Sequence, residues 1–167
     1  MVRTTRPKNS KRLIMLEVFR KLGDHKPVED IGAYIREQVS SHQGVRVYVG
    51  SDSHNTVSET KLATVIVIHY GNNGAHVLYT KTSIPLMRDR FSRLWMEVTS
   101  SVEVAKYLTD ECAVKVAFVD LDLNDDPRYK SNSVLRAALG YTESQGFKAR
   151  WKPFSPLSVS IADSICR

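Results

Sequence analysis

The first half of the chain contains three segments in which β-branched and other apolar residues are bounded by turn residues. Val45–Gly50 is a short valine-rich run that leads directly into Ser51–Asn55, which are predicted as a polar turn and are the first candidate site. Lys61–Tyr70 and Ala75–Thr82 are two further strand-like segments, and Gly71–Gly74 between them has the composition of a hairpin turn. Three successive strands of this kind predict an antiparallel meander.

Helical periodicity flanks this meander on both sides. Before it, Ser10–Leu22 has a helical pattern, and a second helix is predicted over about Val28–Ser40. After it, apolar residues recur at helical spacing over Met87–Thr109. On a helical wheel, Glu97 lies about 80° from the centre of the apolar stripe of this long helix, so it can flank the core.

The second half of the chain alternates strands and helices. Val114–Asn124 is predicted as a strand, Ser131–Gln145 as a helix, Phe147–Pro153 as a strand and Leu157–Arg167 as a closing helix. The serine and proline at 155 and 156 are an N-cap and first-turn signal for that last helix. The expected order is three strands, helix, strand, helix, strand, helix, which is typical of an α/β domain.

Composition narrows the class of protein without identifying it. A chain of 167 residues with 42% hydrophobic and 25% charged residues is long enough for one domain with a core and short for two. No apolar run approaches the roughly 20 residues of a membrane span. Cys112 and Cys166 lack metal-type spacing, which indicates reduced thiols packed as small hydrophobic groups in a cytoplasmic protein.

The net charge of +6 comes from the start of the chain. Residues 1–26 hold eight basic residues against two acidic ones, whereas the remaining 141 residues hold 16 of each. A basic arm suits contact with a phosphate backbone. A merely solvated extension explains the charge equally well, and an acid-poor start also resembles a transit peptide. The expected organisation is a basic arm and helix at 1–26, followed by a single domain at 27–167.

Acidic residues stand at the ends of predicted strands and on two helices. Asp120 and Asp122 end the apolar strand of the second half, and because strand side chains alternate, both lie on one face. Asp52 follows the first strand of the meander. Carboxylates there are costly unless water, a cation or a donor meets them, and α/β sheets bind ligands at such edges. Two further acids, Glu97 and Asp163, lie on the long helix and on the closing helix.

Each acid also has a purely structural interpretation. Asp52 suits an Asx turn after a strand, the pair Asp120 and Asp122 suits solvation of a loop, and Glu97 suits the rim of the core. Asp163 lies about 160° from the centre of the apolar stripe of its helix, so it faces either solvent or a cleft across small residues. Each signal alone is weak. A functional site is favoured because the four positions follow one another along a succession of strands and helices that resembles a known fold.

That succession resembles the ribonuclease H-like fold, in which a three-stranded meander is extended by two parallel strands through right-handed crossovers. The acids occur in VGSDSHN (Asp52), WMEVTSSVEV (Glu97), VDLDLN (Asp122 or Asp120) and SIADSICR (Asp163). More narrowly, GSDSHN, DLDLN with PRYKSN close behind, and then ALGY, SQGF and KP resemble the YkuK family of predicted ribonuclease H-like proteins over roughly residues 45–167. The resemblance implies an α/β fold with a mixed five-stranded sheet flanked by helices, here preceded by an N-terminal helical extension.

The resemblance also implies a metal-dependent nuclease that hydrolyses phosphodiester bonds of RNA or DNA by a two-metal carboxylate mechanism. Mg²⁺ or Mn²⁺ prefers oxygen ligands, which this chain supplies as carboxylates. Asp52 would bridge both ions, Glu97 and Asp122 would hold one, and Asp163 would hold the other. The third acid of the YkuK pattern matches Asp122 better than Asp120, but the additional acid leaves both open.

The same interpretation names the partners of the site. Nucleic acid would be bound through the metal site and the basic N-terminal arm. His54 or Lys152 could assist proton transfer or neutralise charge, although a loop histidine and a surface lysine are the simpler interpretations.

Other classes of protein remain open at this stage. A non-catalytic ribonuclease H-like module that binds nucleic acid or protein would share the fold, because a fold does not imply an activity. Four retained acids argue mildly against a pure phosphate binder. Phosphatases with an aspartyl nucleophile also use an aspartate-x-aspartate strand end, but theirs normally comes near the chain start. A purely structural protein has no repeats to support it.

Overall fold

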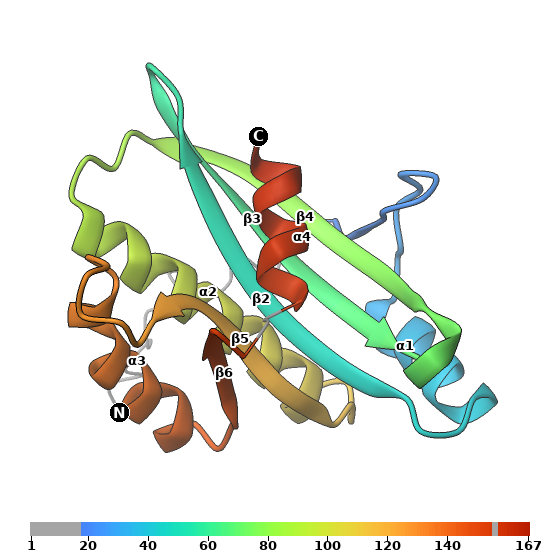
Figure 1. The fold of residues 1–167 in the computed structure, drawn as a ribbon. Helices are drawn as coiled ribbons and strands as arrows, with labels where there is room; N and C mark the ends of the chain where they lie inside the picture. Colours follow the sequence, from blue (N-terminus) through green and yellow to red (C-terminus); the bar gives the residue numbers. More distant parts are fainter. Residues whose placement is uncertain (1–17, 155–156) are drawn as a thin grey trace, which may run out of the picture.

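The computed structural model describes residues 18–154 and 157–167, and they build one six-stranded mixed sheet flanked by helices (Figure 1). The strand order is β1-β4-β3-β2-β5-β6. The strands are β1 (Arg20–Lys21), β2 (Arg46–Asn55), β3 (Glu59–His69), β4 (Ala75–Pro85), β5 (Val116–Asn124) and β6 (Ala149–Lys152), and the helices are α1 (Ile31–Ser41), α2 (Arg90–Asp110), α3 (Asn132–Ser144) and α4 (Leu157–Cys166).

The pairing of the strands confirms the predicted arrangement of a meander and two parallel additions. β2 pairs with β3, and β3 with β4, both antiparallel. β5 then pairs with β2, and β6 with β5, both parallel. α2 carries the chain from β4 across the sheet to β5 beside β2, and α3 carries it from β5 to the neighbouring β6. Parallel neighbours require such crossover connections.

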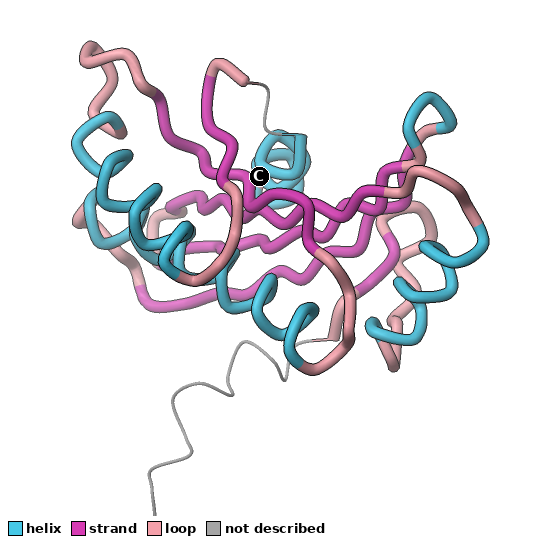
Figure 2. Tube along the Cα trace, turned by 90° about the horizontal axis from the view of Figure 1, so that it is seen from below, coloured by secondary structure: helices cyan, strands magenta, loops and turns pink. Residues whose placement is uncertain are grey.

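The helices divide unequally between the two faces of the sheet, as Figure 2 shows. α1, α2 and α3 cover one face, where the larger core includes Ile35, Val102 and Leu135. α4 crosses the other face, where Ala162 and Cys166 pack with a smaller set of strand residues that includes Tyr48. The sheet therefore has one thickly covered face and one face that α4 covers in part.

Local sequence signals explain where the first two helices of the thickly covered face begin. The side chain of Asp30 accepts a hydrogen bond from the backbone N–H of Ala33 at 2.8 Å, which caps α1. Asp89 accepts one from the N–H of Ser92 at 2.7 Å, which caps α2. Aspartate at this position satisfies a helix N–H that has no partner within the helix.

Two expectations about local structure are wrong. The predicted helix Ser10–Leu22 lies partly outside the described residues, and its described end contains β1, which pairs with β4 and makes the sheet six-stranded rather than five-stranded. Ser51–Asn55 is not a turn, because β2 continues to Asn55. The predicted hairpin between β3 and β4 is present, and Gly71–Asn73 forms a short 3-10 helix within it.

The two cysteines are free and buried, as expected. Cys112 packs in the larger core and Cys166 in the smaller one. The sulfur of Cys166 also donates a hydrogen bond of 3.0 Å to the backbone carbonyl of Asp52. Within the part of the chain that the structure describes, none of the helices is long and apolar enough to cross a membrane.

Candidate active site

The site begins where strands β2 and β5 stop pairing. Their last paired residues are Gly50 and Asp120. Asp52 and Asp122 each lie two positions further along, so alternation places both side chains on the face of that pair. Because Gly50 and Asp120 both contact Ser158 of α4, this is the face that α4 covers. Two carboxylates from neighbouring strands therefore flank the point where the strands part.

Asp120 is fully buried and its carboxylate is already saturated with donors. Arg150 of β6 donates to both oxygens, at 2.8 and 2.9 Å. The backbone N–H and the hydroxyl of Ser158 donate to Oδ2 at 3.1 and 2.5 Å. A carboxylate held by four donors connects the sheet with α4 and has little capacity left for a further ligand.

Close packing at Gly50 sets the position of α4 and hence of Asp163. A Cβ added to Gly50 would lie 2.5 Å from Oγ of Ser158 and 3.1 Å from the backbone N of Val159, so only glycine permits this approach. The buried residues of α4 are Ser158, Val159, Ala162 and Cys166. Asp163 lies beside this small-residue surface, and its charge and a side-chain hydrogen bond both act on Asp52, so its side chain points toward Asp52.

Glu97 approaches the same point from the other face of the sheet. It lies in α2 and is only 5% exposed. Ser53 of β2 donates a hydrogen bond of 2.5 Å to its Oε1. As the neighbour of Asp52 in an alternating strand, Ser53 faces α2. The four acids thus come from β2, α2, β5 and α4 and approach the parting strands from both faces.

The pKa values of these acids show that their charges interact. The pKa of Asp52 is raised to about 7, first by burial and then by the charge of Asp122. The charge of Asp163 and a side-chain hydrogen bond to Asp163 act in the same direction, against a backbone hydrogen bond that lowers the pKa. Burial likewise raises the pKa of Glu97 to about 8, with the charges of Asp52 and Asp122 acting in the same direction. Closely spaced carboxyl groups in a region of low dielectric resist ionising together.

Two cations of the chain itself meet the acids. Lys152, at the end of β6, forms an ion pair with Asp122. Burial lowers the pKa of Lys152, but the hydrogen bond and charge of Asp122, with the charges of Asp52 and Asp163, raise it overall. Arg167 pairs with Asp163 at 3.0 Å. Lys152 and Arg167 therefore supply positive charge that partly offsets the repulsion among the carboxylates.

The donor set suits a hard divalent cation, although its side chains do not yet form a coordination shell. All four acids offer carboxylate oxygens, which Mg²⁺ and Mn²⁺ prefer. Oδ1 of Asp122 is buried, and among the described residues it is met by the ammonium group of Lys152 in an ion pair. Among residues 18–154 and 157–167, no three His, Cys, Asp or Glu side chains are gathered closely enough to hold a metal ion. Binding a cation would require the two ion pairs to loosen and the carboxylates to draw together.

The raised pKa values predict how the stability of the metal-free protein depends on pH. Between about pH 4 and pH 8 the folded state binds more protons than the unfolded chain, because the folded pKa values of Asp52 and Glu97 are the higher ones. The free energy of unfolding should therefore fall as pH rises through this window. Since one pKa unit corresponds to about 1.4 kcal/mol, Asp52→Asn should be more stable than the parent at pH 8 by on the order of 2 to 4 kcal/mol.

Urea unfolding in chelator at several pH values measures this effect. The difference between the Asp52→Asn variant and the parent should shrink toward pH 4, where both carry a neutral group at position 52. Equal pH profiles for the two proteins would contradict the electrostatic description of the site.

Some residues of the site could not be identified from sequence patterns. Ser53 is a polar residue beside Asp52, but nothing in the sequence connects it with Glu97 in a distant helix. The partnership of Asp120 with Arg150 depends equally on the fold. The pairing of Asp163 with Arg167 follows helical i,i+4 spacing and could have been predicted. His54 is exposed on β2, two positions after Asp52.

Comparisons with known proteins identify the family. The sequence matches the Ribonuclease H-like family over residues 26–167, which is most of the chain. Among solved structures, it is similar to the N-terminal RNase H domain of a Mycobacterium tuberculosis protein determined as a fusion with maltose-binding protein, with 12% identity over 74% of this chain and 96% of that chain and a TM-score of 0.36. No curated protein sequence matches significantly. The chain belongs to the ribonuclease H-like family.

Proposed function

We propose that this protein is a divalent-metal-dependent nuclease that hydrolyses phosphodiester bonds of RNA or DNA. The observation that carries the proposal is the approach of Asp52, Glu97, Asp122 and Asp163, from four different elements, to the point where β2 and β5 part. Their mutual repulsion contributes to the raised pKa values of Asp52 and Glu97. Such perturbed carboxyl groups in one cleft are typical of functional sites.

The proposed ligands follow from the position of each carboxylate. Asp52 lies between the others along β2 and interacts with both Asp122 and Asp163, so it is the acid that would contact two Mg²⁺ or Mn²⁺ ions. Glu97 and Asp122 would hold one ion and Asp163 the other. Bound divalent ions of this kind activate water and stabilise the leaving oxygen of a phosphodiester.

The remaining polar residues would prepare the site. The hydroxyl of Ser53 fixes the rotamer of Glu97. Lys152 holds Asp122 until a cation competes for it, and its released ammonium group would then be available to a phosphate oxygen. His54, exposed on the strand of Asp52, remains a candidate for proton transfer. Asp120 serves the fold by anchoring Arg150 and α4.

A non-catalytic nucleic-acid- or protein-binding module is the alternative that a specific observation favours. Lys152 and Arg167 already neutralise two of the four acids, and such internal ion pairs suit a site that no longer recruits cations.

An activity assay discriminates between the nuclease and the binding module. Labelled single-stranded and double-stranded RNA and DNA and an RNA–DNA hybrid are each incubated with Mg²⁺, Mn²⁺ or chelator. Metal-dependent cleavage of any of them supports the nuclease, and binding without cleavage of all of them supports the module.

We also assign the protein, within the ribonuclease H-like family, to the YkuK group. The support is the combination of GSDSHN, DLDLN and PRYKSN in that order along the chain. We place its activity in the cytoplasm, in keeping with two free buried cysteines.

The basic arm should add affinity that does not depend on sequence. Deleting residues 1–12 removes five cations (Arg3, Arg6, Lys8, Lys11 and Arg12). Binding of nucleic acid in chelator should weaken, and the slope of log K against log salt should fall by on the order of 0.7 to 0.9 for each phosphate that the arm neutralises in the parent.

A matched control separates charge from length in this experiment. Residues 1–12 are replaced by a glycine-serine segment of equal length, and this variant should behave like the deletion. An unchanged salt slope in both variants would mean that the arm does not contact the nucleic acid.

A further inference from the structure

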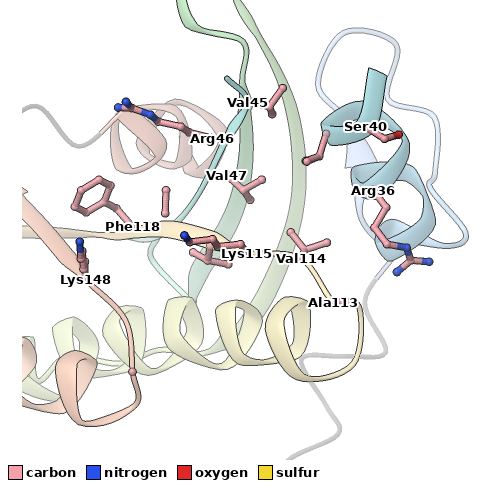
Figure 3. A pocket seen from close by; sticks show the side chains of 14 residues that line it. Arg36, Ser40, Val45, Arg46, Val47, Ala113, Val114, Lys115, Phe118 and Lys148 are labelled. Carbon is pink, nitrogen blue, oxygen red and sulfur yellow. The ribbon is translucent and has the colours of Figure 1, made fainter. Parts of the chain in front are cut away.

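A second feature lies at the opposite end of the strands that carry the acids. A cavity of about 740 Å³ opens where β2 and β5 begin, between the end of α1 and the residues that precede β6. Figure 3 shows Arg46, Phe118 and Lys148 on one side of it, Lys115 near its middle and Arg36 of α1 on the other side. Its size falls within the range of ligand-binding cavities.

The polar lining of this cavity is cationic. Arg46, Lys115 and Lys148 are all exposed, and none of them forms an ion pair with an acidic side chain of the described residues. Arg36 is fixed by a hydrogen bond of 2.6 Å to the carbonyl of Cys112. No acidic residue of the described chain lines the cavity. Unpaired cations around a concave surface attract an anion of matching shape.

The lining of the cavity also includes apolar side chains and one aromatic ring. Phe118 lines the cavity and is half-buried, with 6.3 Å between the centres of its ring and that of Tyr48 in the smaller core. The guanidinium group of Arg150 lies 5.0 Å from the centre of the Phe118 ring, and Asp120 holds that group in place. An aromatic ring in the lining of a cationic cavity is suited to stacking against a nucleobase.

Strand β6 connects this cavity with the acidic site. Arg150 and Lys152 of β6 lie on the face that carries Asp120 and Asp122, because Arg150 bonds to Asp120 and Lys152 pairs with Asp122. Lys148, directly before β6, precedes Arg150 by two positions, so alternation places it on the same face. Lys148 is thus a cation at the cavity and Lys152 a cation at the acidic site. Asp52 lies six positions after Arg46 on β2, which corresponds to about 20 Å.

We infer that this cavity binds phosphates of a single nucleic-acid strand, another part of which lies at the acidic site about 20 Å away. This inference rests on the proposed function, because the ligand is the same nucleic acid. Arg46, Lys115 and Lys148 contact phosphates, and Phe118 receives an unpaired base. A single strand fits better than a duplex, since the bases of a duplex are stacked on each other and do not reach a recessed ring.

The test is a binding measurement in chelator, where cleavage cannot occur. A fluorescent single-stranded oligonucleotide of about 12 nucleotides is titrated with the full chain and with the double variant Lys115→Gln, Lys148→Gln. The matched control is Arg90→Gln, Arg136→Gln, which removes the same charge at two exposed positions outside both the cavity and the basic arm. We expect the cavity variant to bind about tenfold more weakly at low salt. Its slope of log K against log salt should be smaller by about 1.4, because two phosphate contacts are lost and each contributes about 0.7.

Each outcome of this experiment has one meaning. A control variant with the parent's affinity, beside the weakened cavity variant, supports the inference. Equal affinities of the cavity variant and the parent would overturn it while leaving the nuclease proposal in place. Full competition by a mononucleotide at equal phosphate concentration would assign the cavity to free nucleotides instead and would also overturn it. If the parent does not bind the oligonucleotide at all, both this inference and the nucleic-acid substrate of the proposed function fail.

Discussion

The Asp52→Asn variant should lose cleavage by on the order of 10³-fold or more while remaining folded. Asparagine keeps the shape of aspartate but removes the charge that the proposed site places between the other acids. Asp52 interacts with Asp122, with Asp163 and with Glu97, so its replacement affects every proposed metal contact. Initial cleavage rates of the preferred substrate at several Mn²⁺ concentrations measure the effect.

A control variant distinguishes removal of a ligand from disruption of the fold. Asp126→Asn alters another acid that follows β5, one that pairs with Arg128 and lies outside the cluster. It should cut at the parent's rate. The Asp52→Asn variant should also bind the oligonucleotide in chelator at least as tightly as the parent, because one negative charge has been removed from the cleft. If it cuts as fast as the parent at equal metal, the proposed mechanism is wrong.

Replacing Asp120 by asparagine should destabilise the protein by about 3 to 5 kcal/mol. Arg150 has a side chain that is only 22% exposed, and Asp120 is its ion-pair partner. The neutral side chain would leave that charge uncompensated and would weaken the contact with Ser158 that holds α4 on the sheet. Urea unfolding followed by circular dichroism measures the decrease.

The same experiment separates the two aspartates of β5. Asp122→Asn should leave the free energy of unfolding nearly unchanged or raised, because it relieves repulsion in the cluster, and it should abolish cleavage.

Combining Asp120→Asn with Arg150→Met should lower the free energy of unfolding by less than the sum of the two single changes, since the unpaired charge is then gone. If the Asp120→Asn variant instead folds as stably as the parent and no longer cleaves, Asp120 is the metal ligand and the proposed roles of Asp120 and Asp122 are reversed.

The strands and the longer helices were predictable because their signals are local. Alternating and β-branched residues define β3 and β4, and helical spacing defines α2 to within a few residues. β1 was not predictable, since it contains two residues that become a strand only through pairing with Tyr79 and Leu78 of β4. The length of β2 was underestimated because polar Ser51–Asn55 suggested a turn, whereas β3 pairs with all of these residues.

The candidate acids were also found from local context, but their roles depend on tertiary contacts. Sequence spacing could not decide between Asp120 and Asp122, which share a strand face. The structure separates them through Arg150 and Ser158, which are 30 and 38 positions away from Asp120. For Asp163, the apolar stripe of the helix was misleading, because the buried side of α4 is the small-residue side. Close approach at Gly50 explains this choice.

The most direct test of a shared cation site is a crystal of the full chain soaked in Mn²⁺ and measured with anomalous scattering. We expect a manganese peak about 2.1 Å from carboxylate oxygens of both Asp52 and Asp122, with Lys152 displaced from Asp122. A peak that contacts Asp120 but not Asp52, or no peak near either strand at saturating manganese, would contradict a cation site shared by β2 and β5.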